Sequence, residues 1–237
     1  MVYVSRFFAP ASSGIPAGDL EVGKVVRLNE NGTPVDYLVV NQGIPEDSPL
    51  YDASCEGTWL LRKDIRENVV WNTNDVNTLP NSAVIRTMDG YVTDYDDLIQ
   101  SAIKTIKIPY CLGNSSVAVN SGKNGLECKL FPLSGYEFGL TVSDNNAFPV
   151  DGAKLDYFLS GNTTDANNKR IANLNGIPSG QWTRSPVASE SDGGRVNIFT
   201  IVETGRYSSG GAIFSYGLRP ALILSYDFQF TKKEVSA

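Results

Sequence analysis

The sequence predicts a single α+β domain. β-rich runs open the chain, helix-like segments follow, and mostly strand-like segments close it. Twenty-two Gly and twelve Pro, spread over 237 residues, indicate many turns between short elements. Because hydrophobic residues make up 41% of the chain and charged residues 19%, the composition is that of a globular protein. We expect the domain at 20–230, after an arm at 1–19 and before a short charged tail at 231–237.

The first residues are expected to dock on another surface. Phe7, Phe8 and Ile15 lie among prolines and small residues, with no helical or strand period. Aromatic side chains in such a segment need a surface to cover them. The arm therefore either folds back on its own domain or contacts a neighbouring subunit of an assembly.

The first half of the domain is predicted to form a hairpin, a third strand and two helices. Two β-rich runs flank Asn31-Gly32, a pair that tolerates the positive φ angles of a tight hairpin turn. Residues 58–63 (TWLLRK) predict the third strand, and residues 82–92 a short helix. A longer helix is predicted at 94–107. It places five apolar side chains on one face: Leu98, Ile99, Ala102, Ile103 and Ile106.

The second half is predicted to contain strands and long loops. Residues 126–134 read as a strand, and Ser134 three residues before Glu137 matches a capping box. Residues 151–159 suggest a short helix, and the Asn-rich stretch 160–179 suggests a loop. Further strands are expected near 195–203 and 218–228.

Residue content excludes several common catalytic arrangements. The chain has no histidine, which removes the commonest general base and the commonest zinc ligand. Cys55, Cys111 and Cys128 show no C-x-x-C spacing, so a zinc ribbon is not supported, whereas one disulfide with a free thiol remains open. No G-x-S-x-G, P-loop or dinucleotide motif is present. We therefore expect no enzymatic activity, no cofactor and no metal.

Acidic residues leave two weaker alternatives. Asp144, Asp151 and Asp156 could supply the carboxylate pair of a glycan hydrolase, because only their separation in space decides this. The stretch 142–152 offers the oxygen ligands that Ca²⁺ prefers but lacks EF-hand spacing. A chain with 26 acidic residues presents such groupings by number alone, so plain turns are the favoured interpretation of both.

Charge and hydropathy disfavour nucleic acid and membrane partners. The net charge is -6, and the twenty Lys and Arg are scattered without a dense basic cluster. Anionic membrane surfaces are disfavoured for the same reason. No window approaches the roughly 18 apolar residues of a membrane span. The first residues lack a basic segment followed by an apolar core, so we expect synthesis in the cytosol without a secretory leader.

Residues 181–224 form the stretch best suited to display on a surface. Two stiff units, Trp182–Pro186 and Tyr216–Pro220, bracket a run rich in Gly, Ser, Asn, Tyr and Arg. Rigid aromatics mixed with small hydrogen-bonding residues are typical of adaptable binding surfaces. The alternative is that the aromatics are half-buried strand residues around a turn. The candidate ligand contacts are Arg195, Asn197, Phe199, Arg206, Tyr207, Phe214 and Tyr216, and the candidate scaffold residues are Trp182, Arg184 and Arg219.

The order of several motifs resembles an uncharacterised domain family of gut bacteria and of their phages and prophages. Members carry W-L-R-S-P, a stretch rich in Gly, Ser, Asn and Tyr, and then Y-G-V-R-P-A-L. This chain has Thr183 and Leu218 where Leu and Val are usual, which are mild changes. The resemblance covers residues 20–226. It rests on YDASCEGTWLLRKDIRENVVWNTNDVN, VNSGKNGLECKLFPLSGYEFGL, PVDGAKLDYF, QWTRSP and YGLRPALIL.

The closing motifs also resemble C-type-lectin-like folds, in which the late strands and their loops display the binding face. That resemblance implies a mixed or antiparallel sheet, two or more short helices and long loops. No cysteine follows Cys128, so the oxidase activity of formylglycine-generating enzymes is not implied. The lectin tripeptides E-P-N and Q-P-D are absent, so calcium-dependent sugar binding is not implied either.

These resemblances imply a structural protein of a phage virion: a tail-tip, fibre or head-decoration protein. Such a protein is made in the host cytoplasm and is extracellular after release. We expect the arm to bind other virion proteins, the displayed face to bind a host-surface glycan or protein, and the chain to form a homo-oligomer. Two alternatives stay open: a purely structural virion or assembly protein without a host ligand, and a bacterial surface-binding module.

Overall fold

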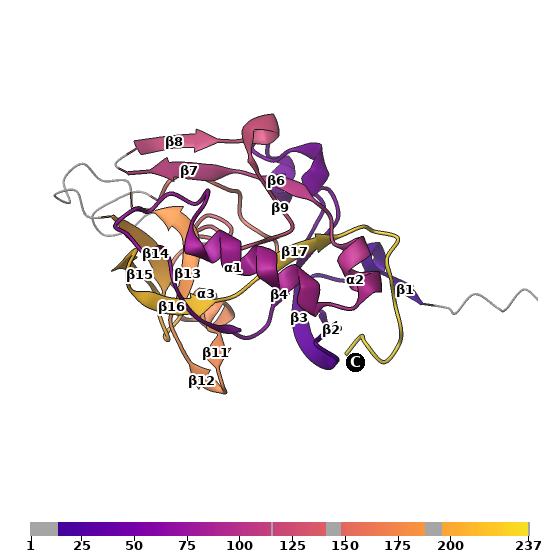
Figure 1. The fold of residues 1–237 in the computed structure, drawn as a ribbon. Coiled ribbons are helices and arrows are strands. Elements are labelled where there is room, and N and C mark those ends of the chain that lie inside the picture. Colours follow the sequence, from indigo (N-terminus) through magenta and orange to yellow (C-terminus); the bar gives the residue numbers. More distant parts are fainter. Residues whose placement is uncertain (1–13, 115, 141–147, 188–195, 237) are drawn as a thin grey trace, which may run out of the picture.

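A computed structural model describes residues 14–114, 116–140, 148–187 and 196–236. It confirms the α+β class, since sheets dominate and the helices are few and short (Figure 1). Among these residues, the two largest sheets have five strands each. No helix in this part of the chain is long and apolar enough to cross a membrane.

The first large sheet is antiparallel throughout and has the order β10-β17-β4-β3-β2. Its outer hairpin turns at Asn31 and Gly32, whose φ angles of 51° and 74° confirm the turn expected from this pair. Strand β17 lies between β10 and β4 and is fully buried along its length. The strands are β2 (Val25–Glu30), β3 (Thr33–Gln42), β4 (Thr58–Arg62), β10 (Leu130–Phe131) and β17 (Ala221–Leu224).

The second large sheet is mixed and has the order β15-β14-β13-β16-β5. Strands β13 and β16 are parallel, and the other neighbours are antiparallel. A T-shaped stack of Trp71, Trp182 and Tyr216 packs on this sheet, with ring centroids 5.7 and 4.7 Å apart. The strands are β5 (Glu67–Val70), β13 (Gln181–Pro186), β14 (Asn197–Ile201), β15 (Tyr207–Gly211) and β16 (Ser215–Leu218).

Two short crossovers carry the chain between the large sheets. One joins β4 to β5, and the other joins β16 to β17 through Arg219 and Pro220. The crossovers are bonded to each other, because Arg62 N donates to Pro220 O and Arg66 N donates to Leu218 O, both at 2.9 Å. Segments distant in sequence are therefore held side by side at the junction of the sheets.

Helix α1 (Ala83–Tyr91) confirms the short helix expected at 82–92. The Ser82 hydroxyl caps it by accepting a hydrogen bond from Ile85 N at 3.2 Å. Its buried residues include Val84 and Met88, and Figure 1 shows the helix lying across the body of the molecule.

The longer helix expected at 94–107 is wrong. Only α2 (Asp97–Ala102) is helical, and Ile103 is extended and bridges Leu224 of β17. The chain then enters β6 (Ile106–Ile108), which pairs with β9 (Leu126–Cys128). The β-branched alternation of Ile106 and Ile108 fits a half-buried strand and outweighs the helical spacing. Leu98, assigned to the apolar helix face, is instead 73% exposed.

Two further expectations in the second half are wrong. Residues 151–159 form turns without a helix. The stretch 160–179, expected to be a loop, contains α3 (Thr164–Arg170) and a small hairpin of β11 (Asn173–Leu174) and β12 (Ile177–Pro178). The Asn175-Gly176 turn of this hairpin has φ angles of 53° and 81°, the same signature as the first hairpin.

The first and last residues that the structure describes lie against the domain. Strand β1 (Ile15–Pro16) pairs with β18 (Gln229–Phe230), and Ala17 is fully buried. Residues 14–19 of the expected arm therefore belong to the domain body. The expected tail also contacts it, because Ser236 N donates to Val25 O at 2.9 Å.

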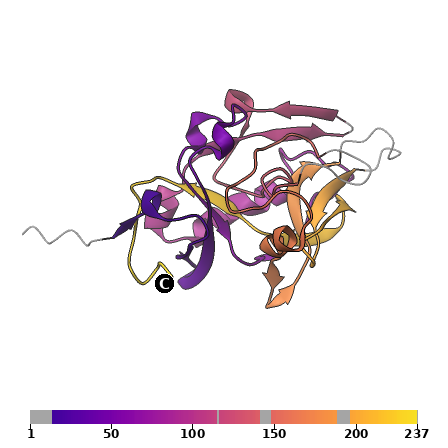
Figure 2. The same ribbon diagram turned by 180° about the vertical axis from the view of Figure 1, so that it is seen from behind.

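Smaller elements complete the fold. A hairpin of β7 (Tyr110–Gly113) and β8 (Ser116–Asn120) lies at the top of Figure 1, and Figure 2 shows it from behind. The short 3-10 helices are η1 (Ala17–Asp19), η2 (Pro45–Asp47), η3 (Ala53–Cys55), η4 (Val92–Asp94) and η5 (Gly122–Asn124).

Candidate functional site

The W-T-R-S-P motif lies at the buried centre of the molecule. It forms β13, and all six residues of that strand are buried. The Arg184 guanidinium pairs with both carboxylate oxygens of Glu137 at 2.5 and 2.6 Å. Its remaining donors reach the carbonyls of Pro109, Pro132 and Asp151 at 2.7–3.2 Å. This is a forked, fully hydrogen-bonded arginine–carboxylate pair.

Glu137 is held from several sides. Its Oε2 accepts from Ser134 N at 2.9 Å, and its own N–H donates to Ser134 Oγ at 3.1 Å. These reciprocal bonds confirm the capping box, here on a tight turn. Tyr51 donates to Glu137 Oε1 at 2.8 Å. Burial opposes the charge on Arg184, but Glu137 and Asp151 outweigh it and raise the pKa of the guanidinium.

Asp151 and Ser185 form the adjacent part of this cluster. Ser185 Oγ donates to the Asp151 carboxyl, with 3.0 and 2.9 Å to its two oxygens, and accepts from Gly135 N at 2.9 Å. Burial raises the pKa of Asp151 to about 7, although Arg184 and the Ser185 hydroxyl act in the opposite direction. A carboxyl group with this pKa changes protonation near neutral pH.

The cluster of Glu137, Asp151, Arg184 and Ser185 is sealed from solvent, since the four residues are 0% exposed. A substrate cannot reach a group without accessible surface. The cluster ties the turn after β10, the segment around residue 151 and the second large sheet together. Its chemistry is therefore structural: it holds β13 in place beside β14 in the second large sheet.

The arginine of the Y-G-L-R-P motif, Arg219, has fewer hydrogen bonds than Arg184 in the described part of the chain. Arg219 is 4% exposed, and its Nε donates to Arg62 O at 2.7 Å. Its Nη1 is buried and has no hydrogen-bond partner within the described part of the chain. Burial lowers the pKa of Arg219 to about 10, and the negative charge of nearby Asp64 offsets only part of this lowering.

The structure separates the candidate contact residues into buried and exposed groups. Phe199 is only 4% exposed and stacks on Phe148 with ring centroids 4.0 Å apart, so it is a core residue and not a surface contact. Tyr207 is half-buried, its ring edge-on to Phe148 at 5.5 Å. Tyr216 is half-buried against Trp182. Arg195 lies outside the described residues.

The exposed residues meet at the outer strands of the second sheet. Phe214 is 59% exposed, and it packs beside Gly211, which faces Asn197 across the β14–β15 pair. Ile213, which the sequence interpretation missed, is 51% exposed in the same turn. A pair of apolar residues in a Gly- and Ser-rich turn was the available signal. We define the β14–β16 surface as Asn197, Arg206, Tyr207, Ile213, Phe214 and Tyr216.

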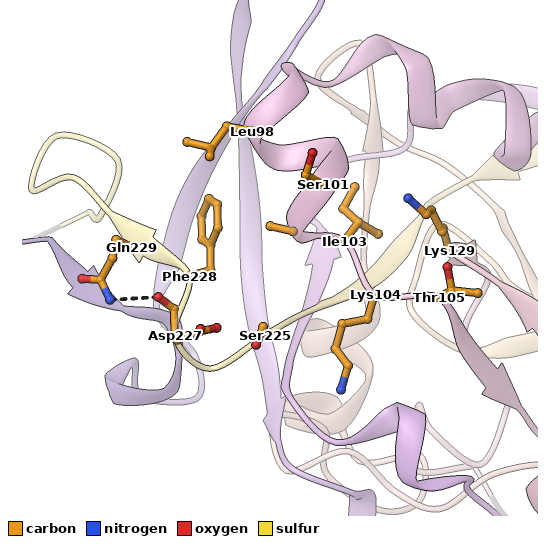
Figure 3. A pocket seen from close by; sticks show the side chains of 11 residues that line it. Leu98, Ser101, Ile103, Lys104, Thr105, Lys129, Ser225, Asp227, Phe228 and Gln229 are labelled. Atoms are coloured by element: carbon orange, nitrogen blue, oxygen red, sulfur yellow. Dashed lines mark hydrogen bonds between the residues drawn. The ribbon is translucent and has the colours of Figure 1, made fainter.

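Of the three candidate docking residues in the arm, the structure describes only Ile15. Phe7 and Phe8 lie outside the described residues, whereas Ile15 is half-buried in β1. A groove of about 710 Å³ lies beside β18 and is lined by α2, the segment after it and the chain from Ser225 to Gln229. Figure 3 shows Leu98 and Phe228 on one side of the groove and Lys104 and Lys129 on the other.

The described residues offer neither a metal site nor a disulfide. No group of three acidic or sulfur ligands there could hold a metal ion. Cys55, Cys111 and Cys128 are free and buried, which excludes a disulfide among them. Burial raises the pKa of the Cys55 and Cys111 thiols to about 11. These cysteines are small core residues.

Comparison with known proteins identifies the family. No curated protein and no solved structure matches the chain. Residues 56–226, which include both arginine motifs, the buried cluster and the β14–β16 surface, match a family described as "Domain of unknown function (DUF6273)". Because the match covers well over half of the 237 residues, the chain belongs to this DUF6273 family.

Proposed function

We propose that the protein is a structural component of a phage virion, at the tail tip, in a fibre or as head decoration, and that its β14–β16 surface binds a host-surface glycan or protein. The observation that carries the binding role is the exposed apolar turn at Ile213 and Phe214. Large exposed apolar side chains grouped with polar neighbours mark interaction sites. The virion role rests on the motif resemblance.

The layer beneath this surface favours a rigid presentation. Strand β14 pairs along its length with β15, and on the neighbouring strand β13 Trp182 donates from Nε1 to Val69 O at 2.8 Å. The buried Arg184–Glu137 pair fixes β13. A preformed surface loses little conformational entropy on binding, so a small patch suffices for a useful affinity.

The residues between the aromatics supply adaptable contacts. Ser208 and Ser209 are exposed on β15, and Arg206 is exposed at its start. Hydroxyl and guanidinium donors beside apolar side chains fit a ligand with mixed polar and apolar faces, such as a glycan or a protein loop. A C-type-lectin-like arrangement is our proposed finer fold class, because four of the five strands of the second sheet, β13 to β16, come from the last part of the chain.

Docking to other virion proteins is assigned to the arm and the groove beside it. Gly14 contacts Gln229 and Phe230, so the arm enters the domain next to the groove of Figure 3. The groove combines exposed apolar Leu98 with two lysines. Such a lining suits an amphipathic segment of a neighbouring subunit, in agreement with the proposed homo-oligomer.

The test separates recognition from assembly. Phe214→Ala and Ile213→Ala are introduced into phage particles together with Ile177→Ala as a control, since Ile177 is 68% exposed on the separate β11–β12 hairpin. We expect normal incorporation of all three variants and of the double variant that combines Phe214→Ala with Ile213→Ala. The double variant should adsorb to host cells at least about tenfold less, because central apolar contacts contribute about 1 kcal/mol or more each.

Other outcomes favour the alternatives. Normal adsorption with failed particle assembly would make the β14–β16 surface a subunit contact, as in a purely structural virion protein. Absence of the chain from purified particles would favour a bacterial surface-binding module and contradict the virion role.

A further inference from the structure

A second cavity lies where the two large sheets are joined. Its volume is about 270 Å³, and it is bordered by both crossovers, with Lys63 and Asp64 from one and Arg219 from the other. The end of α3 contributes Asn168 and Lys169. None of these residues belongs to the β14–β16 surface, so the cavity is independent of the function proposed above.

The unusual group in this cavity is Arg219. Its Nε donates to Arg62 O, but the buried Nη1 has no hydrogen-bond partner among the residues that the structure describes. Buried cations in proteins are normally paired with an anion or fully hydrogen-bonded. Asp64 also lines the cavity, yet its Oδ1 accepts from Asn173 N and Nδ2 at 3.3 and 3.2 Å and no bond joins it to Arg219. Among the described residues, Asp64 therefore acts on Arg219 only as a nearby charge, and no carboxylate is hydrogen-bonded to its guanidinium.

The rest of the lining also favours an anion. Lys63, Lys169 and Arg219 line the cavity together with one carboxylate, Asp64. Lys63 also pairs with Asp36 at 3.5 Å, so the positive excess comes from Lys169 and Arg219 over Asp64. Lys169 is fixed, because its Nζ donates to Tyr157 O at 2.9 Å and lies 4.3 Å from the Tyr157 ring centroid. A held lysine beside a buried guanidinium creates a positive field inside a partly enclosed space.

The size and the remaining walls narrow the ligand class. A volume of about 270 Å³ is much larger than an inorganic ion needs and just below the range of about 300 Å³ and upward that is typical of drug-sized ligands. Asn168 and Asn173 offer amide groups, and Val25 and Leu38 offer apolar walls. These features suit a single small organic unit with one charged group and several hydroxyls.

We propose that this cavity binds a small organic carboxylate, with the carboxylate paired to the Arg219 guanidinium and the body of the ligand between the asparagines and the apolar wall. An acidic sugar such as glucuronate has this combination of groups. The ligand supplies a carboxylate that is hydrogen-bonded to Arg219, and it joins the two crossovers through a common contact.

The binding test uses ¹⁵N-labelled full-length protein and four probes: glucuronate, acetate, glucose and inorganic phosphate. We expect glucuronate to give saturable shifts of the amide signals of residues 63–64, 168–169 and 219. Glucose lacks the carboxylate and should bind at least about tenfold more weakly. A hydrogen bond between charged groups changes the affinity by about that factor or more. Acetate should bind more weakly than glucuronate, since it fills less of the cavity.

Variants test the role of the charges. Arg219→Met should abolish the glucuronate shifts. Arg219→Met also removes the hydrogen bond to Arg62 O, so a second variant that leaves the core intact is needed. Asn168 is exposed, and the negative charge added by Asn168→Asp should weaken glucuronate binding about threefold or more. Asn162→Asp, also exposed and absent from the lining, is the matched control and should leave binding unchanged.

Three results would overturn the proposal. One is the absence of saturable binding by glucuronate. Another is binding of phosphate or glucose as tight as that of glucuronate, which would indicate a general anion site or a neutral sugar site. The third is equal weakening by Asn168→Asp and Asn162→Asp, which would place the ligand elsewhere.

Discussion

The two arginines of the two sequence motifs differ in how their charge is compensated. Both precede or nearly precede a proline, and both are buried. Arg184 is bonded to a carboxylate and three carbonyls, whereas Arg219 has one carbonyl partner and an unpaired Nη1. A buried arginine such as Arg184, whose counter-ion is supplied by the fold, is structural. A buried arginine such as Arg219, to which the fold bonds no carboxylate, is a candidate contact for a ligand.

The largest expected effect comes from breaking the Arg184–Glu137 pair. Glu137→Gln leaves a buried guanidinium without its carboxylate and should destabilise the fold by about 3–5 kcal/mol. Equilibrium unfolding in urea measures it. The matched control is Asp36→Asn, which breaks the partly exposed pairs of Asp36 with Arg27 and Lys63 and should cost about 1 kcal/mol or less. Equal losses for both variants would contradict the structural role of the buried pair.

Arg219→Met is expected to have a smaller effect on stability. It removes one hydrogen bond to Arg62 O but also removes a buried charge without a partner, and these two effects oppose each other. The free energy of unfolding should change by about 1 kcal/mol or less in the absence of ligand. A loss as large as that of Glu137→Gln would show that Arg219 is as structural as Arg184.

The pH dependence of stability should report Asp151. Its pKa is raised to about 7 in the folded protein, so between about pH 4 and 7 the folded state holds a proton that the unfolded state has released. This contribution is complete below the unfolded pKa and is lost as the pH rises toward 7. Asp151→Asn mimics the neutral carboxyl, so its stability relative to the wild type should increase from pH 5 to pH 8. Urea unfolding at four pH values tests this, and a constant difference would contradict the raised pKa.

The smallest expected effect on stability is that of Phe214→Ala on the β14–β16 surface. The side chain is mostly exposed, so its removal should change the free energy of unfolding by about 0.5 kcal/mol or less. The same change should reduce host adsorption, as described above. Thermal unfolding of the variant checks the first half, and a large loss of stability would make Phe214 a packing residue.

Local features of the fold could be predicted from the sequence because their signals lie within a few residues. The Asn31-Gly32 turn, the short helix at 82–92 and the Ser134–Glu137 capping box all appear where the sequence indicates them. The Asn175-Gly176 turn carried the same signal and was missed within an Asn-rich stretch. The helix at 94–107 was overpredicted because tertiary pairing of Ile106 and Ile108 overrides local spacing.

The candidate sites could be predicted only in part because they join distant segments. Arg184 and Glu137 are separated by 47 residues, and Arg219 and Arg62 by 157. No local pattern shows which arginine receives a counter-ion, or that Phe199 faces the core while Phe214 faces solvent. The cavity at the crossovers exists only once both sheets are formed.

The most direct test of the difference between the two arginines is ligand-linked stability. Urea unfolding of the wild type and of Arg219→Met is measured with and without glucuronate in large excess. At about 100 times its dissociation constant, the ligand should raise the free energy of unfolding of the wild type by about 2.7 kcal/mol. We predict that gain for the wild type and none for Arg219→Met. Equal gains in both proteins, or none in the wild type, would contradict the assignment of Arg219 as a ligand-binding residue.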